Sequence, residues 1–138
     1  MRYLLDTDVV CELRKVGSPR AHPGFVAWAK KQTTNEAISA VTLFELEVGV
    51  RRVERRDVTQ GFRLRHWLNG VQATFEEGIL PLDAQVATAA AVFHVPDPAS
   101  DRDAYIAATA QVHGLVVVTR NVADFDTFGV PLLNPWDE

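Results

Sequence analysis

Short runs of consecutive aliphatic residues alternate with helical segments along this chain, and this order constrains the fold more than any other feature. The run at residues 115–119 contains four aliphatic side chains and a threonine without polar interruption. Uninterrupted apolar strands are typical of parallel sheets whose two faces are both covered by helices. The sequence therefore predicts an α/β fold with a mainly parallel central sheet flanked by helices. We expect strands at residues 2–5, 37–40, 79–82, 115–119 and 130–133, helices at 9–14, 23–31, 42–56, 61–75, 84–93 and 102–113, and a loop at 119–125.

Length and composition are those of a single-domain globular protein. At 138 residues, with 47% hydrophobic and 23% charged side chains, the chain can bury one sizeable core, so we expect one domain over residues 1–138. No apolar run approaches the ~18 residues of a membrane-spanning helix, and Asp6 interrupts any signal-like stretch, so no membrane partner is expected. The lone cysteine, Cys11, excludes a disulfide framework and fits a cytoplasmic setting.

Acidic side chains follow the predicted strands where a functional site is expected. Ligand sites of open parallel sheets form outside the carboxyl ends of the strands. Asp6 follows the first strand, Glu45 and Asp103 lie in the first turns of two helices, and Asp124 follows the 115–119 strand across a loop. Carboxylates placed together repel one another and stay ionised only with a counter-cation. Oxygen ligands without a His or Cys cluster favour Mg²⁺, with Mn²⁺ as a substitute, over Zn²⁺.

A structural role is the alternative for two of these acids. The spacing Thr42-x-x-Glu45 matches a helix capping box, and Ser100-x-x-Asp103 nearly matches one. Either acid could therefore satisfy a helix N-terminus instead of holding a metal ion. Asp6 is different, because a carboxylate directly after a buried strand costs free energy unless it has a partner.

The segment DTD at residues 6–8 also fits the opening motif of haloacid-dehalogenase-like phosphatases, in which the first aspartate is the nucleophile. Those enzymes hold the phosphoryl group with a lysine later in the chain. All three lysines of this sequence lie before residue 32. The sequence therefore argues against this class of phosphatase.

Charge is distributed unevenly along the chain. The net charge is −4, but residues 51–66 contain six arginines against two acids, a local charge of +4. Arginines four residues apart share one face of a helix. Such a run is usually a plain solvated surface, but its position on the helix that carries Glu45 favours a basic face that contacts a nucleic-acid backbone. The four arginines of this predicted basic face are Arg51, Arg52, Arg55 and Arg56.

Four segments of the chain, taken in order, resemble a known family. They are YLLDTD at 3–8, ISAVTLFEL at 38–46, DAYIAATA at 103–110 and VTRNVADF at 118–125, and the ending NPW at 134–136 agrees with them. In these segments the sequence resembles PIN-domain ribonucleases, and within them the VapC/FitB-like toxins of type II toxin–antitoxin pairs. The resemblance spans essentially the whole chain and implies a PIN-like fold.

The resemblance also implies roles for individual residues. Asp6, Glu45, Asp103 and Asp124 correspond to the four acids that bind the metal ion and carry catalysis in this family. Thr119 and Asn121 correspond to polar positions beside the metal ion, and some relatives carry the fourth acid at the position of Asn121, so either Asn121 or Asp124 could complete the site. Asp8 stands where the family usually has asparagine.

The activity implied by the resemblance is Mg²⁺-dependent endonucleolytic cleavage of RNA by a metal-activated water. The implied partners are an RNA substrate, a second copy of the chain in a homodimer and a VapB/FitA-like antitoxin, with DNA bound only through the antitoxin. The implied location is the bacterial cytoplasm. Two alternatives stay open: a non-catalytic PIN-like module that binds RNA or a partner, and a metal-dependent DNA nuclease or phosphatase.

Overall fold

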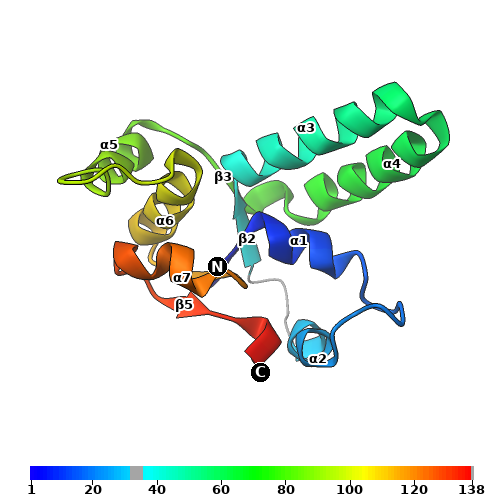
Figure 1. Ribbon diagram of the computed structural model, residues 1–138, viewed down its shortest axis with the longest axis horizontal. Coiled ribbons are helices and arrows are strands. Elements are labelled where there is room, and N and C mark those ends of the chain that lie inside the picture. Colours follow the sequence, from blue (N-terminus) through cyan, green and yellow to red (C-terminus); the bar gives the residue numbers. More distant parts are fainter. Residues whose placement is uncertain (32–35, 138) are drawn as a thin grey trace.

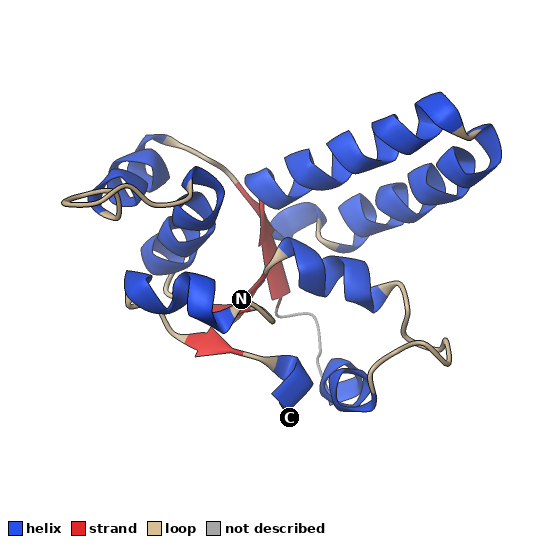
Figure 2. Ribbon diagram, viewed as in Figure 1, coloured by secondary structure: helices blue, strands red, loops and turns tan. Residues whose placement is uncertain are grey.

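The computed structural model describes residues 1–31 and 36–137, and its centre is a five-stranded parallel sheet. The strand order is β3-β2-β1-β4-β5, and all four pairings are parallel. Helices cover both faces of the sheet (Figures 1 and 2). This arrangement confirms the predicted α/β fold. The strands are β1 (Tyr3–Leu5), β2 (Glu36–Ser39), β3 (Ile79–Leu80), β4 (Val116–Val118) and β5 (Leu132–Leu133).

The helices follow the predicted segments with small changes at their ends. The predicted 23–31 helix has these bounds in the structure, whereas the helices predicted from residues 42 and 61 begin two and three residues earlier. The α-helices are α1 (Thr7–Leu13), α2 (Pro23–Lys31), α3 (Ala40–Arg56), α4 (Val58–Thr74), α5 (Ala84–Val92), α6 (Asp101–His113) and α7 (Val122–Phe125). Three-residue 3₁₀ turns cover Glu76–Gly78, Asp126–Phe128 and Pro135–Asp137.

Two predictions about the C-terminal part of the chain were wrong. The predicted loop at 119–125 contains the one-turn helix α7, whose last residue, Phe125, is buried against the ring of Phe128. A helix this short has too few residues to show a periodic apolar pattern in the sequence, and the buried ring of Phe125 holds it in place. The strand predicted at 130–133 pairs only over Leu132–Leu133, although the carbonyl of Pro131 still accepts a hydrogen bond from the amide of Val117.

Successive residues of the central strands pack into two separate cores. Leu4 and Val117 face the core formed with α5, α6 and α7, whereas Leu5 and Val118 face the core formed with α1, α2, α3 and α4. The two groups of helices lie on opposite sides of the sheet in Figure 1. Strands buried on both faces need apolar side chains at every position, which is why the sequence shows continuous aliphatic runs.

The register places the carboxyl ends of the two middle strands at one level. Leu5 of β1 is paired with Val118 of β4, and the amide of Asp6 donates to the carbonyl of Val118 at 2.9 Å. Asp6 and Thr119 are therefore neighbours at the point where both strands end. The sheet itself thus brings together residues more than a hundred positions apart in the sequence.

Helices α3 and α4 form a long antiparallel hairpin that extends away from the sheet (Figure 1). Asp57 alone connects them, and its carboxylate accepts from the amide of Gln60 at 3.0 Å as the N-cap of α4. The helices approach closely at Gly61, where an added Cβ would lie 2.6 Å from the Cα of Glu54. In the described part of the chain, no helix has the length and apolar character needed to cross a membrane.

Candidate active site

Asp6 is fully buried at the junction of β1 and α1. Its Oδ1 accepts from the amide of Thr7 at 2.8 Å, so the side chain is the N-cap of α1. Its Oδ2 accepts from the hydroxyl of Thr119 at 2.9 Å. A buried carboxylate costs several kcal/mol unless a positive charge compensates it, so Asp6 requires a cation nearby.

Arg102, in the first turn of α6, supplies that positive charge. Its guanidinium contacts three carboxylates from three different parts of the chain, each through a different nitrogen. The contacts are Nη2 to Asp6 Oδ1 at 2.7 Å, Nε to Glu45 Oε2 at 2.7 Å and Nη1 to Asp103 Oδ1 at 2.6 Å. We call these four residues the Arg102 cluster. It holds one guanidinium against three carboxylates, so its acids are only partly neutralised.

Burial and charge act in opposite directions inside the Arg102 cluster. Burial alone would lower the pKa of the Arg102 guanidinium, but its bonds to Glu45 and Asp6 raise that pKa above the ordinary value. For Asp103, burial raises the pKa of the carboxyl group more than Arg102 lowers it, and the nearby charges of Asp6 and Asp124 raise it further. The fold therefore holds this carboxylate in its charged form at a cost.

Glu45 projects from α3 and is oriented by the helix that follows β1. The hydroxyl of Thr7 donates to Glu45 Oε1 at 2.6 Å, while Oε2 of the same carboxylate contacts Arg102. The capping interpretation of Glu45 was wrong. Helix α3 begins at Ala40, with Ser39 as the N-cap, so Glu45 lies in the second turn, beyond the reach of a capping box.

Asp103 lies beside a genuine helix cap but is not its reciprocal partner. Ser100 is the N-cap of α6, and its hydroxyl oxygen accepts from the backbone amide of Asp103 at 3.3 Å. The carboxylate of Asp103 instead contacts Arg102. Capping at this helix therefore depends on Ser100 and on the backbone of residue 103, and not on its side chain.

The remaining predicted site residues surround the Arg102 cluster without joining it. Thr119 binds Asp6 and also accepts from the amide of Asn121 at 3.0 Å. The side-chain amide of Asn121 donates to Asp8 Oδ2 at 2.9 Å. Asp124 is exposed on α7 and acts on Asp103 through its charge. The structure thus gathers Asp6, Glu45 and Asp103 around one cation and places the other predicted residues at the margin.

A divalent metal ion would meet a suitable set of donor atoms here. The cluster offers oxygen atoms only, from three carboxylates of which one is fully buried, and these are the ligands that Mg²⁺ prefers. Across residues 1–31 and 36–137, however, no three acidic, histidine or cysteine side chains converge as a ready-made metal site. The three carboxylates each meet Arg102 instead.

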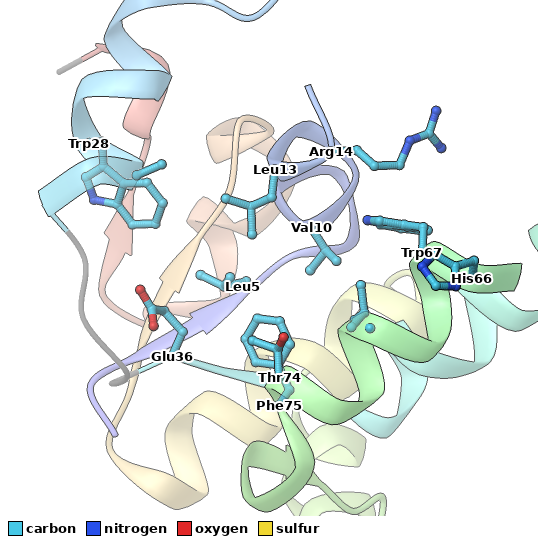
Figure 3. A pocket seen from close by; sticks show the side chains of 13 residues that line it. Leu5, Val10, Leu13, Arg14, Trp28, Glu36, His66, Trp67, Thr74 and Phe75 are labelled. Carbon is cyan, nitrogen blue, oxygen red and sulfur yellow. The ribbon is translucent and has the colours of Figure 1, made fainter. Parts of the chain in front are cut away.

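One surface hollow adjoins the Arg102 cluster, and a second lies elsewhere on the molecule. A groove of about 460 Å³ adjoins the Arg102 cluster, and Phe44, Leu82 and Tyr105 line it together with Glu45 and Arg102. A second hollow, of about 630 Å³, lies between α1, α2 and α4 (Figure 3). Its described lining is mainly apolar, with Glu36 as its one carboxylate, and no residue of the Arg102 cluster lines it.

The four arginines of the predicted basic face are all exposed on α3. At 100° per residue, Arg52 and Arg56 point within about 20° of the direction of Glu45 around the helix axis. Arg51 and Arg55 point about 80–120° to one side, and Arg51 pairs with Glu47 at 3.3 Å. Only two of the four arginines thus continue the face that begins at the Arg102 cluster.

Sequence reasoning missed Arg102. The signal was present, because three acids expected at one edge of a sheet require a cation, and an arginine stands directly before one of them. Arg65, counted in the sequence as part of a basic run, is occupied by Glu47 and Glu54 of the neighbouring helix. A linear pattern shows which charges are close in sequence, but it does not show which are already paired.

Comparison with known proteins identifies the family of this chain. The model of the PIN domain family matches residues 3–129. The VapC ribonuclease Y4jK of Sinorhizobium fredii is 32% identical, over 97% of each chain. Toxin FitB of Neisseria gonorrhoeae is also 32% identical, over 98% of this chain and 99% of its own length.

Solved structures give the same result. The crystal structure of FitAcB from Neisseria gonorrhoeae superposes with a TM-score of 0.88 at 31% identity and covers 99% of both chains. A toxin-antitoxin complex from Klebsiella pneumoniae gives a TM-score of 0.66 at 29% identity, over 96% of this chain and 97% of that one. From its family match, its full-length relatives and its sheet topology, this chain belongs to the PIN-domain family.

Proposed function

We propose that this protein is a Mg²⁺-dependent endoribonuclease that acts as the toxin of a toxin–antitoxin pair. The observation that carries the proposal is the Arg102 cluster: three carboxylates from separate segments share one cation where the middle strands end. A relative named as a ribonuclease and another named as a toxin, both aligned over nearly the whole chain, support the same activity.

Asp6, Glu45 and Asp103 are the residues that would hold the metal ion, with Asp124 or Asn121 beside them. A bound Mg²⁺ would activate a water molecule, neutralise the scissile phosphate and stabilise the leaving 3′-oxygen. The fixed position of Asp6 supports this role, because Thr7 and Thr119 each donate to one of its oxygens. Thr7 also orients Glu45, so two of the three carboxylates are held by hydrogen bonds that do not involve Arg102.

The face of α3 that starts at Glu45 would guide the RNA backbone. Arg52 and Arg56 lie ~10 and ~16 Å further along the helix axis, at 1.5 Å per residue. No described acid pairs with either of them. Exposed guanidinium groups in a line with the acids can neutralise phosphates on one side of the cleaved bond.

The proposal includes a protein partner. The Klebsiella relative was solved as a toxin-antitoxin complex. The resemblance to VapC/FitB-like toxins further implies a homodimer and an antitoxin that binds DNA. We expect the product of an adjacent gene to form a stable complex with this protein. Coexpression followed by size-exclusion chromatography tests this, and a protein that elutes as an uncomplexed monomer would contradict this part of the proposal.

The activity is tested by comparing three substrates. Purified protein is incubated with single-stranded RNA, duplex DNA or a small phosphate ester, each in EDTA, Mg²⁺ and Mn²⁺. The expected result is internal cleavage of RNA that requires a divalent ion. Cleavage of duplex DNA or of the ester alone would favour the DNA nuclease or phosphatase alternative, and RNA binding without cleavage would favour a non-catalytic PIN-like module.

A further inference from the structure

We infer that Arg102 competes with the divalent metal ion for the three carboxylates and thereby sets the metal affinity of this site. The inference rests on the proposed function, because it concerns the metal ion that the function requires. It goes further in assigning a role to a residue of the chain itself: Arg102 acts as a built-in counter-cation that must leave before the metal ion can bind.

The geometry of the guanidinium carries the argument. Nε, Nη1 and Nη2 each contact a different carboxylate at 2.6–2.7 Å, so Arg102 lies at the point where the three acids meet. The described carboxylates do not converge on a common empty point. A metal ion with ligand distances near 2.1 Å would draw on the same three carboxylates. Each of them gives one oxygen atom to Arg102, so the ion and the guanidinium compete for them.

Electrostatics gives the same result. The cluster has one positive charge against three negative charges, so it retains attraction for a more highly charged cation. If Arg102 stayed in place, its charge would lie only a few ångströms from the metal ion and would repel it. Exchange of the guanidinium for a divalent ion removes this repulsion and balances the acids better.

Arg102 also has room to leave. Its side chain is 32% exposed, unlike that of Asp6, which has no exposed surface. The groove of about 460 Å³ that adjoins the cluster is lined by Arg102 itself, with Phe44, Leu82 and Tyr105. A rotation of this side chain into the groove would free the three carboxylates without any change in the strands or helices that hold them.

The size of the effect follows from population arithmetic. The apparent affinity of a ligand equals its intrinsic affinity multiplied by the fraction of molecules in which its site is open. If Arg102 is released in about one molecule in ten, its removal should tighten metal binding about tenfold. Arg102→Lys should fall between the wild type and Arg102→Gln, because an ammonium group is a point charge and lacks the fork that reaches three carboxylates at once.

The experiment measures Mn²⁺ binding without any substrate. Electron paramagnetic resonance of free Mn²⁺, or calorimetric titration, gives the dissociation constant for the wild type, Arg102→Gln and Arg102→Lys. Arg65→Gln is the matched control, because Arg65 also holds two carboxylates but lies on the α3–α4 hairpin. We expect tighter binding by Arg102→Gln, an intermediate value for Arg102→Lys and the wild-type value for Arg65→Gln.

The outcomes separate this inference from the proposed function. Mn²⁺ binding that is equal or weaker in Arg102→Gln than in the wild type overturns the competition and leaves the metal site intact. An absence of Mn²⁺ binding in all four proteins overturns both. If Arg102→Gln does not fold, Arg102→Lys decides alone: tighter binding than the wild type supports the competition, and unchanged or weaker binding overturns it.

Discussion

Two arginines of this protein each hold more than one carboxylate, and the difference between their surroundings separates a structural contact from a candidate site. Arg65 projects from α4 and contacts Glu47 at 2.8 Å and Glu54 at 2.9 Å, both on α3. These contacts join two neighbouring helices. They raise the pKa of the Arg65 guanidinium and lower the pKa of both glutamate carboxyl groups, mainly through hydrogen bonds.

The Arg102 cluster has similar distances but a different balance. With Arg51 included, the hairpin sets two arginines against two glutamates, whereas Arg102 alone faces three acids. Those acids come from separate elements, and one is fully buried. An isolated ion pair at a surface contributes little to stability. In the Arg102 cluster, by contrast, three carboxylates share one guanidinium, and this excess of negative charge favours a further cation and distinguishes the candidate site.

The largest expected effect is the loss of activity in Asp6→Asn. The substitution removes a ligand charge without removing volume, and asparagine can still cap α1. Mutation of a residue that only supports a metal ligand lowers metal affinity or activity by about 10–100-fold. We therefore expect loss of a ligand itself to lower RNA cleavage by at least about 100-fold. Cleavage assays and relief of growth inhibition on expression measure the effect.

Glu47→Gln is the matched control for Asp6→Asn, since it alters a carboxylate held by arginine in the hairpin. Its cleavage rate should equal that of the wild type within about twofold, because Glu47 pairs with Arg51 and Arg65 and not with Arg102. Circular dichroism confirms that both variants are folded. Full activity in a folded Asp6→Asn protein would remove the metal assignment, and equal losses in both variants would erase the distinction between the two clusters.

The second effect concerns the response of stability to Mn²⁺. A ligand that binds only the folded protein stabilises it by ~2.7 kcal/mol at a hundredfold excess over its dissociation constant. Wild type and Glu47→Gln should show this gain in thermal melts, and Asp103→Ala should show much less. In EDTA, Asp103→Ala should be as stable as the wild type or more so, because the fold holds the Asp103 carboxylate at a cost.

Capping by Asp103 would give the opposite pattern. Loss of a helix cap costs ~1 kcal/mol with or without metal, so the variant would melt lower in EDTA yet respond to Mn²⁺ like the wild type. Such a result would remove Asp103 from the site. The structure argues against it, because Ser100 bonds to the backbone amide of residue 103, which alanine retains.

The sequence predicted most of the fold because the fold depends on short-range patterns. The aliphatic run at 115–119 and the helical spacing at 42–56 each report a local preference, and the order of the elements then favours a parallel sheet. Sheet geometry also predicted that Asp6 and Glu45 would lie near the carboxyl ends of the strands. The helix α7 was missed because its stability comes from the burial of Phe125 and not from local preference.

The sequence indicated that the acids need a cation, but it did not show which side chains would pair. The contact between Arg102 and Asp6 joins residues 96 positions apart, and no spacing rule connects them. The capping interpretation of Glu45 failed for a related reason: Ser39 and Thr42 are both acceptable caps in sequence, and the length of β2 decides between them. Whether the Arg102 guanidinium or a divalent metal ion occupies the space between the three carboxylates depends on the balance of charge, which no sequence pattern encodes.

The third effect concerns the basic face of α3 and separates two pairs of arginines with equal charge. Arg52→Gln with Arg56→Gln removes the pair on the face of Glu45, and Arg51→Gln with Arg55→Gln removes the other pair. The logarithm of single-strand affinity falls with salt at ~0.7 per phosphate contact. The first double variant should therefore reduce this slope by about 1.4 in filter-binding assays.

The second double variant controls for net charge and should change the slope by a small fraction of that amount. Neither pair contacts a carboxylate of the Arg102 cluster, so Mn²⁺ binding should stay at the wild-type value in both. Equal slopes in the two variants would mean that RNA does not follow the face of Glu45. An unchanged slope in both would make the arginine run an ordinary solvated surface.

The smallest effect is on the pH dependence of stability, which should have opposite signs for the Arg102 cluster and for the carboxylates held by Arg65. Burial raises the pKa of the Asp103 carboxyl group, so the folded protein binds more protons than the unfolded chain between the ordinary value of about 3.9 and the raised one. Stability should fall as the pH rises through that interval. Hydrogen bonds from Arg65 lower the pKa of Glu47 and Glu54, so the contribution of these two carboxylates to stability should rise as the pH approaches about 4.3 from below.

Urea unfolding of the metal-free protein, of Asp103→Asn and of Glu47→Gln from pH 3 to 6.5 measures both pH dependences. With rising pH, the free energy of unfolding of Asp103→Asn should increase relative to that of the wild type, and that of Glu47→Gln should decrease. A change of the same sign in both variants would mean that the Asp103 carboxylate is as well compensated as those of the hairpin.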